Sequence, residues 1–186
     1  YAKQALKQAA VSLIKNELDV MRLRHLRHPG ADYTPWKYLR YWPDRGGSDS
    51  WITRLRRIFR PGKARRLICE SCLVHDHPDQ LFPNEIRNVN NNYFSMSSGV
   101  INWTNQSIMF RKKWFLETII PYAQAHPSSR RVNGFSDLEK ELNGRWWRKQ
   151  QFRVGWANPG LFTHQRMDRP RKDEKNIRYE KDLDEV

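Results

Sequence analysis

Cysteines, acidic side chains and long apolar runs are all scarce in this chain of 186 residues. Its two cysteines, Cys69 and Cys72, exclude a scaffold held together by several disulfides. No apolar run approaches the roughly 18–20 residues that a membrane-spanning helix needs. No signal or transit peptide is visible, and we expect any such segment to precede Tyr1, since a chain that begins with Tyr is processed, trimmed or partial. The class that remains is a globular domain with a substantial core.

The scarcity of acidic residues is greatest in the N-terminal third. Residues 1–66 hold 16 Lys and Arg against 5 Asp and Glu, whereas residues 67–129 hold 4 against 5 and residues 130–186 hold 14 against 10. A basic segment of this kind predicts an anionic neighbour, which is a nucleic acid, a membrane surface, an acidic protein or a phosphate-bearing substrate. The alternative is a basic surface that faces only solvent.

The two cysteines stand close to two histidines in the segment CESCLVHDH. Cys69, Cys72, His75 and His77 therefore lie within nine residues. Structural zinc sites usually join two separated pairs of ligands across a loop, and this cluster is too compressed for that arrangement. We therefore expect no zinc here and predict the edge of a strand that carries free thiols.

Hydrophobic periodicity predicts alternating helices and strands, which is the pattern of an α/β fold. Residues 2–16 repeat apolar side chains at helical spacing, a strand follows directly, and another helix is expected from about Lys112 to Ala125. Residues 166–186 carry 7 basic and 7 acidic residues and few apolar ones, which predicts an exposed or disordered tail after a domain of residues 1–165. Further strands are expected in RRLICESCLV, in YFSMSSGVINWTNQSIMF and in QFRVGW.

We expect residues 29–66 to form a basic and aromatic loop within this domain. Pro and Gly punctuate it, and aromatic rings are interleaved with Lys and Arg. Nucleic-acid-binding proteins use such a mixture to stack bases and contact phosphates, and loops over a nucleotide-sugar site have the same composition. The aromatic residues concerned are Trp36, Tyr38, Tyr41, Trp42 and Trp51.

The segment GFSDLEKELN at residues 134–143 predicts the start of a helix. Ser136 is a good N-cap, and Glu139 three residues later completes a capping box. In this arrangement the cap occupies Glu139, whereas Asp137 is free to point outward. The interpretation that needs no function is that these residues only begin a helix.

Three segments together resemble the GT-A-type glycosyltransferases of the family 2 kind: DVMRLRHLRHPG, INWTNQSIMFRKKWF and VNGFSDLEKELNGRWWRKQQFRVGWANPGLFTHQRMDR. The resemblance covers most of residues 5–169. It implies a GT-A-like mixed sheet flanked by helices, with a nucleotide-binding part that is missing or degenerate here. The family's Asp-x-Asp motif, which binds a divalent metal and the diphosphate, is expected before the first helix and therefore ahead of Tyr1. The one Asp-x-Asp pair in this sequence, Asp182 and Asp184, lies in the tail, which is the wrong position for that role.

The resemblance also implies which residues carry the chemistry. Asp137 or Glu139 occupies the family's position for the base that deprotonates the acceptor hydroxyl during an inverting transfer. The helix macrodipole favours the ionised form of a carboxylate at that position. We predict Asp137 as the base, because the expected capping box leaves it free.

Residues near the C-terminal end of the resemblance are expected to hold the leaving diphosphate. His164 in GLFTH resembles the late histidine that completes a metal site, which implies Mn2+ or Mg2+. Arg166 and Arg169 are expected to hold the diphosphate as fixed cations. The alternative for His164 is a structural histidine in an apolar turn.

Two tryptophans and an asparagine are the remaining candidates for substrate binding. Trp146 and Trp147 are expected to form an apolar platform on which a sugar stacks, and Asn105 is expected to line the acceptor cleft. The alternative for the tryptophans is core packing, where only one of two adjacent helical positions is fully buried. The alternative for Asn105 is a glycosylation sequon, which directly follows a second one at Asn102.

Two functions follow from these features. The first is a glycosyltransferase that moves a sugar from a nucleotide-sugar donor to a hydroxyl acceptor such as a glycan, in a secretory lumen or at a membrane. A variant of this first function is an inactive pseudoenzyme of the same fold. The second is a non-catalytic, Trp-rich subunit of a mitochondrial assembly, such as an organellar ribosome or a respiratory complex, bound to protein or RNA through its basic N-terminal half. An acidic strand end before Tyr1 favours the first, and an Arg-rich presequence favours the second.

Overall fold

Helices and strands alternate along the described part of the chain. The computed structural model describes residues 2–24, 50–64, 66, 76–90, 92–105, 107–132 and 134–162. Several predictions concern residues outside these ranges: His164, Arg166, Arg169, Cys69, Cys72, His75, the expected strand at RRLICESCLV beyond Arg66, residues 29–49 of the basic loop, and the tail 166–186.

Five strands of the described chain form one mixed sheet in the order β2-β3-β7-β1-β4. The strands are β1 (Val20–Arg22), β2 (Arg87–Asn90), β3 (Tyr93–Ser97), β4 (Ile108–Phe110) and β7 (Arg153–Ala157). Strands β1 and β7 are parallel, and the other neighbouring pairs are antiparallel. The predicted mixed α/β sheet flanked by helices is therefore confirmed.

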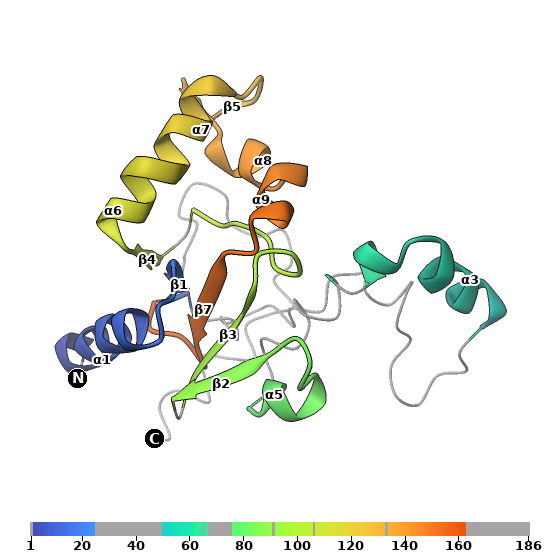
Figure 1. The fold of residues 1–186 in the computed structure, drawn as a ribbon, viewed down its shortest axis with the longest axis horizontal. Coiled ribbons are helices and arrows are strands. Elements are labelled where there is room, and N and C mark those ends of the chain that lie inside the picture. The colour runs from blue at the N-terminus through green and yellow to red at the C-terminus, as the bar shows by residue number, and fades with distance from the viewer. Residues whose placement is uncertain are drawn as a thin grey trace, which may run out of the picture.

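Helices lie on both faces of this sheet, and one further helix, α3, stands apart from it (Figure 1). They are α1 (Ala2–Lys15), α3 (Trp51–Phe59), α5 (Pro78–Leu81), α6 (Lys112–Trp114), the π-helix η1 (Phe115–Ile119), α7 (Ile120–Ala125), α8 (Leu138–Leu142) and α9 (Arg145–Gln150). A short hairpin of β5 (Arg131–Val132) and β6 (Phe135–Ser136) precedes α8. Helix α1 and strands β1, β3, β4 and β7 match the sequence predictions, whereas α5, β2 and the hairpin were not predicted. The expectation of a loop throughout residues 29–66 is wrong for residues 51–59, which form α3 from a cap at Ser50.

The predicted helix at residues 112–125 is present, but it changes register in its middle. Helix α6 passes into the π-helix η1 and then into α7, in which Pro121 stands in the first turn. Proline has no N–H to donate, and its ring clashes with the carbonyl four residues before it in a regular α-helix. The wider π turn directly before Pro121 is consistent with relief of that clash.

Alternation along the strands divides the core into two clusters, one on each face of the sheet. Val154 and Trp156 of β7 face the cluster that α7, α8 and α9 cover, whereas Ala157 faces the cluster that α1 covers. In β1, Val20 and Met21 divide in the same way. Since side chains of a strand point alternately to its two faces, this division fixes the register of the central strands.

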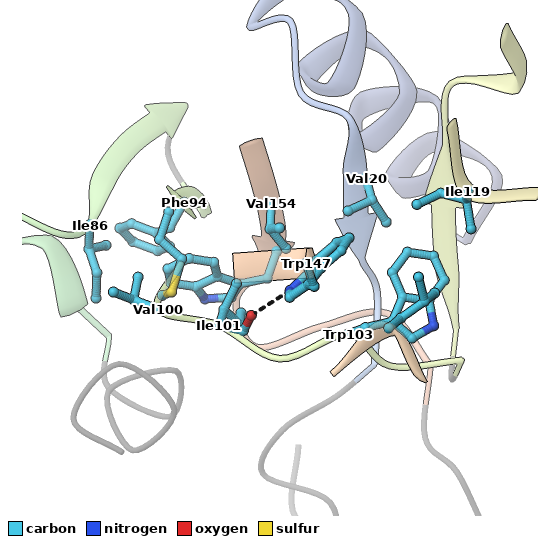
Figure 2. Close-up of a cluster of buried hydrophobic side chains, with 12 residues drawn as sticks. Val20, Ile86, Phe94, Val100, Ile101, Trp103, Ile119, Trp147 and Val154 are labelled. Carbon is cyan, nitrogen blue, oxygen red and sulfur yellow. Dashed lines mark hydrogen bonds between the residues drawn. The ribbon is translucent and has the colours of Figure 1, made fainter. Parts of the chain in front are cut away.

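The larger cluster contains a fully buried tryptophan, Trp147 of α9 (Figure 2). Its Nε1–H donates a hydrogen bond of 2.8 Å to the carbonyl oxygen of Ile101. Its ring also meets that of Trp103 edge-on, with centroids 5.3 Å apart. The indole therefore attaches the loop after β3 to α9, and its one polar group is satisfied inside the core.

Gly155 allows α1 and the loop behind it to approach β7 closely. A Cβ atom at this position would lie 2.6 Å from Cδ1 of Leu18 and 3.1 Å from Sδ of Met21. Leu18 and Met21 are both buried, so neither side chain has open space to move into. The absence of a side chain at residue 155 is thus a packing requirement of the central sheet.

We predict that Gly155→Ala lowers the free energy of unfolding by about 1–3 kcal/mol, because the added methyl group overpacks the smaller cluster. Chemical denaturation monitored by circular dichroism measures the change. Gly62→Ala is the matched control, since nothing lies within 4 Å of a Cβ added there. Equal loss of stability in the two variants would contradict the close approach at Gly155.

Candidate functional site

The acidic turn before α8 is arranged differently from the sequence prediction. Asp137 is the N-cap, and its Oδ1 accepts a hydrogen bond of 3.0 Å from the N–H of Glu139. Its Oδ2 forms an ion pair of 3.2 Å with Nε of Arg130, and its backbone N–H donates to the carbonyl of Arg130 at 2.8 Å. The residue is only 9% exposed. Both carboxylate oxygens of Asp137 are therefore occupied within the protein.

The prediction that Ser136 caps the helix and leaves Asp137 free is wrong. Ser136 belongs to β6 and pairs with Arg131 across the hairpin. Because this pairing keeps the backbone extended through Ser136, the helix begins one residue later than expected. Asp is as good an N-cap as Ser, so the shift costs the helix little.

Glu139 is turned toward the loop after β3 rather than toward the cap. Its Oε1 accepts a hydrogen bond of 3.1 Å from the backbone N–H of Asn105. Glu139 is half-buried, whereas Asn105 is exposed. The structure thus brings together two predicted site residues that are 34 positions apart in the chain.

Asn143 fastens this loop to α8, and sequence reasoning missed it. Its side-chain Nδ2 donates to the carbonyl oxygens of Glu139 at 2.8 Å and Trp103 at 3.1 Å. Its Oδ1 accepts from the N–H of Trp103 at 2.7 Å. In the sequence, Asn143 followed by Gly144 has the pattern of an ordinary helix end, so no local signal indicated these contacts.

Trp103 adds a side-chain contact to the same loop. Its indole Nε1–H donates a hydrogen bond of 2.6 Å to Oδ1 of Asn105. The Trp103 ring is itself buried against Trp147. The backbone N–H that holds Glu139 is therefore carried by a loop that is anchored in the core.

The predicted sugar platform of Trp146 and Trp147 is not formed. Trp147 is fully buried, so its faces cannot meet a substrate, and the prediction for this residue is wrong. Trp146 is half-buried and stacks on Tyr122, with ring centroids 3.8 Å apart and planes at 10°. The expectation that only one of the two would be fully buried is confirmed, because adjacent helical positions point in different directions.

Metal ligands cannot be assigned from the described residues. Among them, no three His, Cys, Asp or Glu side chains come together as a group that could hold an ion. His164 and most of the CESCLVHDH cluster lie outside the described ranges, although His77 lies within them. Mn2+ or Mg2+ at His164 and the absence of zinc at Cys69, Cys72, His75 and His77 therefore stay predictions.

A separate pocket of about 340 Å3 opens at the carboxyl end of β7. Its polar lining includes Asn90, Asn92 and Asn158, and Tyr93 and Leu161 contribute apolar surface. It lies at the opposite end of β7 from α8 and α9 (Figure 1). Open α/β sheets bind ligands at the carboxyl ends of their strands, and this pocket was not predicted from the sequence.

Comparison of the chain with protein-family models, with curated proteins and with solved structures found no match. The class of the protein is therefore defined by its own structure, as an α/β domain with a mixed sheet. Its candidate site is the turn that joins Asp137, Glu139 and Asn105. No helix of the described chain has the length and the apolar character needed to cross a membrane.

We predict that Asp137→Ala lowers the free energy of unfolding by about 0.5–2 kcal/mol, because it removes the cap from the N–H of Glu139. Asp137→Asn should cost less, since an amide oxygen still caps the helix, and the lost ion pair involves an arginine whose side chain is 65% exposed.

Ser136→Ala is the matched control and should change stability by less than about 0.5 kcal/mol. Thermal or urea unfolding of the three variants measures these differences. A larger loss of stability for Ser136→Ala than for Asp137→Ala would show that Ser136, and not Asp137, caps the helix.

Proposed function

We propose that this chain is the acceptor part of a GT-A-like glycosyltransferase, which moves a sugar from a nucleotide-sugar donor to a hydroxyl group with inversion, and that Glu139 is its catalytic base. The resemblance of DVMRLRHLRHPG, INWTNQSIMFRKKWF and the segment around residues 132–169 supports the enzyme class. A mixed sheet flanked by helices is compatible with that class. The choice of Glu139 rests on the contacts of the two acidic residues.

The difference between Asp137 and Glu139 carries this proposal. Asp137 is buried, and its two oxygens serve the helix cap and Arg130. Glu139 is half-buried and accepts one hydrogen bond, at Oε1, from within the described chain. Its second oxygen, Oε2, is therefore the acidic oxygen of this turn that is available to a substrate hydroxyl.

The chemistry requires one proton transfer at that oxygen. As the acceptor oxygen attacks the anomeric carbon, the bond from that carbon to the diphosphate breaks, and the hydroxyl proton passes to Glu139. The N–H of Asn105 holds Oε1 and thereby orients Oε2. A base in this role must come within about 2.6–3.2 Å of the hydroxyl oxygen.

Asp137 acts here as a positioning residue. It fixes the first turn of α8, on which Glu139 stands, and it holds Arg130 beside the hairpin. In the enzymes that the chain resembles, a divalent cation neutralises the leaving diphosphate. His164, Arg166 and Arg169 remain our predictions for residues of this chain that face that group.

We predict that Glu139→Gln lowers the rate of transfer by about 10²–10⁴-fold, because the amide cannot accept the proton, while its shape and its contact with Asn105 are kept. The assay measures sugar transfer and donor hydrolysis by the complete protein with a panel of nucleotide sugars and Mn2+. Glu141→Gln is the matched control, since Glu141 lies on the same helix and pairs with Lys140 at 4.0 Å. That control should keep its full rate.

Asp137→Asn separates the two candidate bases. We expect it to retain most of its activity, because the cap is preserved and the base is untouched. Loss of activity in Asp137→Asn together with full activity in Glu139→Gln would show that Asp137 is the base and that Glu139 is not. Failure of the unmodified protein to transfer or hydrolyse any donor would instead favour the non-catalytic assembly subunit.

A further inference from the structure

Helix α3 exposes its apolar side chains to solvent along one side. Trp51, Ile58 and Phe59 are 70%, 69% and 77% exposed, and Ile52 and Leu55 are exposed as well. At about 100° per residue, these five positions fall within an arc of about 120°. Thr53 is the one buried residue of the helix, and it lies on the opposite side. The apolar face of α3 is therefore not part of the core.

The polar side of α3 and the chain that follows it are strongly basic. Residues 50–66 contain seven Lys and Arg and no Asp or Glu. Arg54 and Arg56 fall on the two borders of the apolar arc at helical spacing, and both are exposed. The basic residues of this segment are Arg54, Arg56, Arg57, Arg60, Lys63, Arg65 and Arg66.

The helix begins at a side-chain cap. Oγ of Ser50 caps it by accepting a hydrogen bond of 3.3 Å from the N–H of Thr53. In Figure 1, α3 stands well away from the sheet and from the helices that cover it. A surface helix of this kind, with large aromatic residues near both ends of an apolar face, is available for a partner.

We propose that α3 binds the surface of an anionic lipid bilayer. The helix lies in the plane of the interface, with Trp51, Ile58 and Phe59 inserted below the headgroups and the arginines directed to the phosphates. A row of nine helical residues is about 13 Å long, which is too short to span a bilayer and sufficient to lie on one. This inference is independent of the proposed transfer reaction.

The combination of features favours lipid over other anionic partners. An RNA would meet the arginines, but it would leave the aliphatic side chains of Ile52, Leu55 and Ile58 in water, since bases stack on aromatic rings. Lipid accepts both kinds of side chain on one surface, because acyl chains cover the apolar arc while headgroups surround its borders. The charge of residues 50–66 matches an anionic leaflet.

Vesicle co-sedimentation of the complete chain tests this inference. We expect binding to vesicles of phosphatidylcholine that contain about 30% phosphatidylserine, which imitates an anionic leaflet. Binding to vesicles of phosphatidylcholine alone should be much weaker. Arg54→Gln with Arg56→Gln should weaken binding about fivefold for each arginine removed. Binding of the unmodified chain should also fall as salt is raised.

The apolar face is tested by Ile58→Asp with Phe59→Asp, which should reduce binding at least about tenfold. Ile14→Asp is the matched control, since Ile14 is 68% exposed on α1, and this variant should bind as the unmodified chain does. Circular dichroism confirms that each variant is folded. Quenching of Trp51 fluorescence by brominated lipids, taken as the difference from Trp51→Phe, should show that this ring enters the bilayer.

Equal binding to neutral and anionic vesicles, or equal binding by the Ile58 and Phe59 double variant and the Ile14 variant, would overturn the proposal. So would the absence of vesicle binding by the unmodified chain. If the chain instead binds an RNA oligonucleotide or a second copy of itself, and the α3 variants abolish that binding, the partner of α3 is RNA or protein.

Discussion

The parallel pairing of β1 with β7 is the contact on which the rest of the structure depends. It places Val20 opposite Val154 and Arg22 opposite Trp156. The pairing therefore joins residues near the two ends of the described chain. Directly before β1, Oδ2 of Asp19 accepts a hydrogen bond of 2.8 Å from the N–H of Arg153, which is the first residue of β7 and 134 positions away. Asp19 also forms an ion pair with Arg111. Strands β3 and β4 then extend the sheet on the two sides of this pair.

The position of the candidate site follows from that pairing through a series of contacts. Strand β7 places α9 directly before it, and α9 buries Trp147, which holds the loop at Ile101 (Figure 2). The same loop continues to Asn105, whose N–H meets Glu139. The orientation of the Glu139 carboxylate is thus a consequence of core packing as well as of α8 itself. This explains how a surface carboxylate on a helix of five residues is held in one direction.

Much of the fold was predictable because the helices and strands have regular periods. The apolar spacing of α1 and the apolar segments of β1, β3 and β7 were each sufficient to place those elements. The N-cap of α8 was not predicted, although the sequence Asn133-Gly134 is a common two-residue hairpin turn and indicated that the extended backbone would continue beyond it. The local cap pattern does not show that strand β6 competes for Ser136.

The site was predicted only in part, because its contacts are long-range. Asn105 and Glu139 were both expected, but their meeting depends on Trp103 and Asn143, which have no local signal. An amphipathic pattern also cannot show whether the core covers its apolar face. Helix α1 buries Ala9 and Leu13 of its own pattern, whereas α3 keeps Trp51 and Phe59 exposed.

The most direct test of the account is a crystal structure of the complete protein with a nucleoside diphosphate and a hydroxyl acceptor. The measurement is the distance from Oε2 of Glu139 to the acceptor oxygen that receives the sugar. We predict a distance of about 2.6–3.2 Å, with Asp137 still capping α8. An acceptor oxygen bound by Asp137 or another carboxylate, with Glu139 directed away from it, would contradict the account.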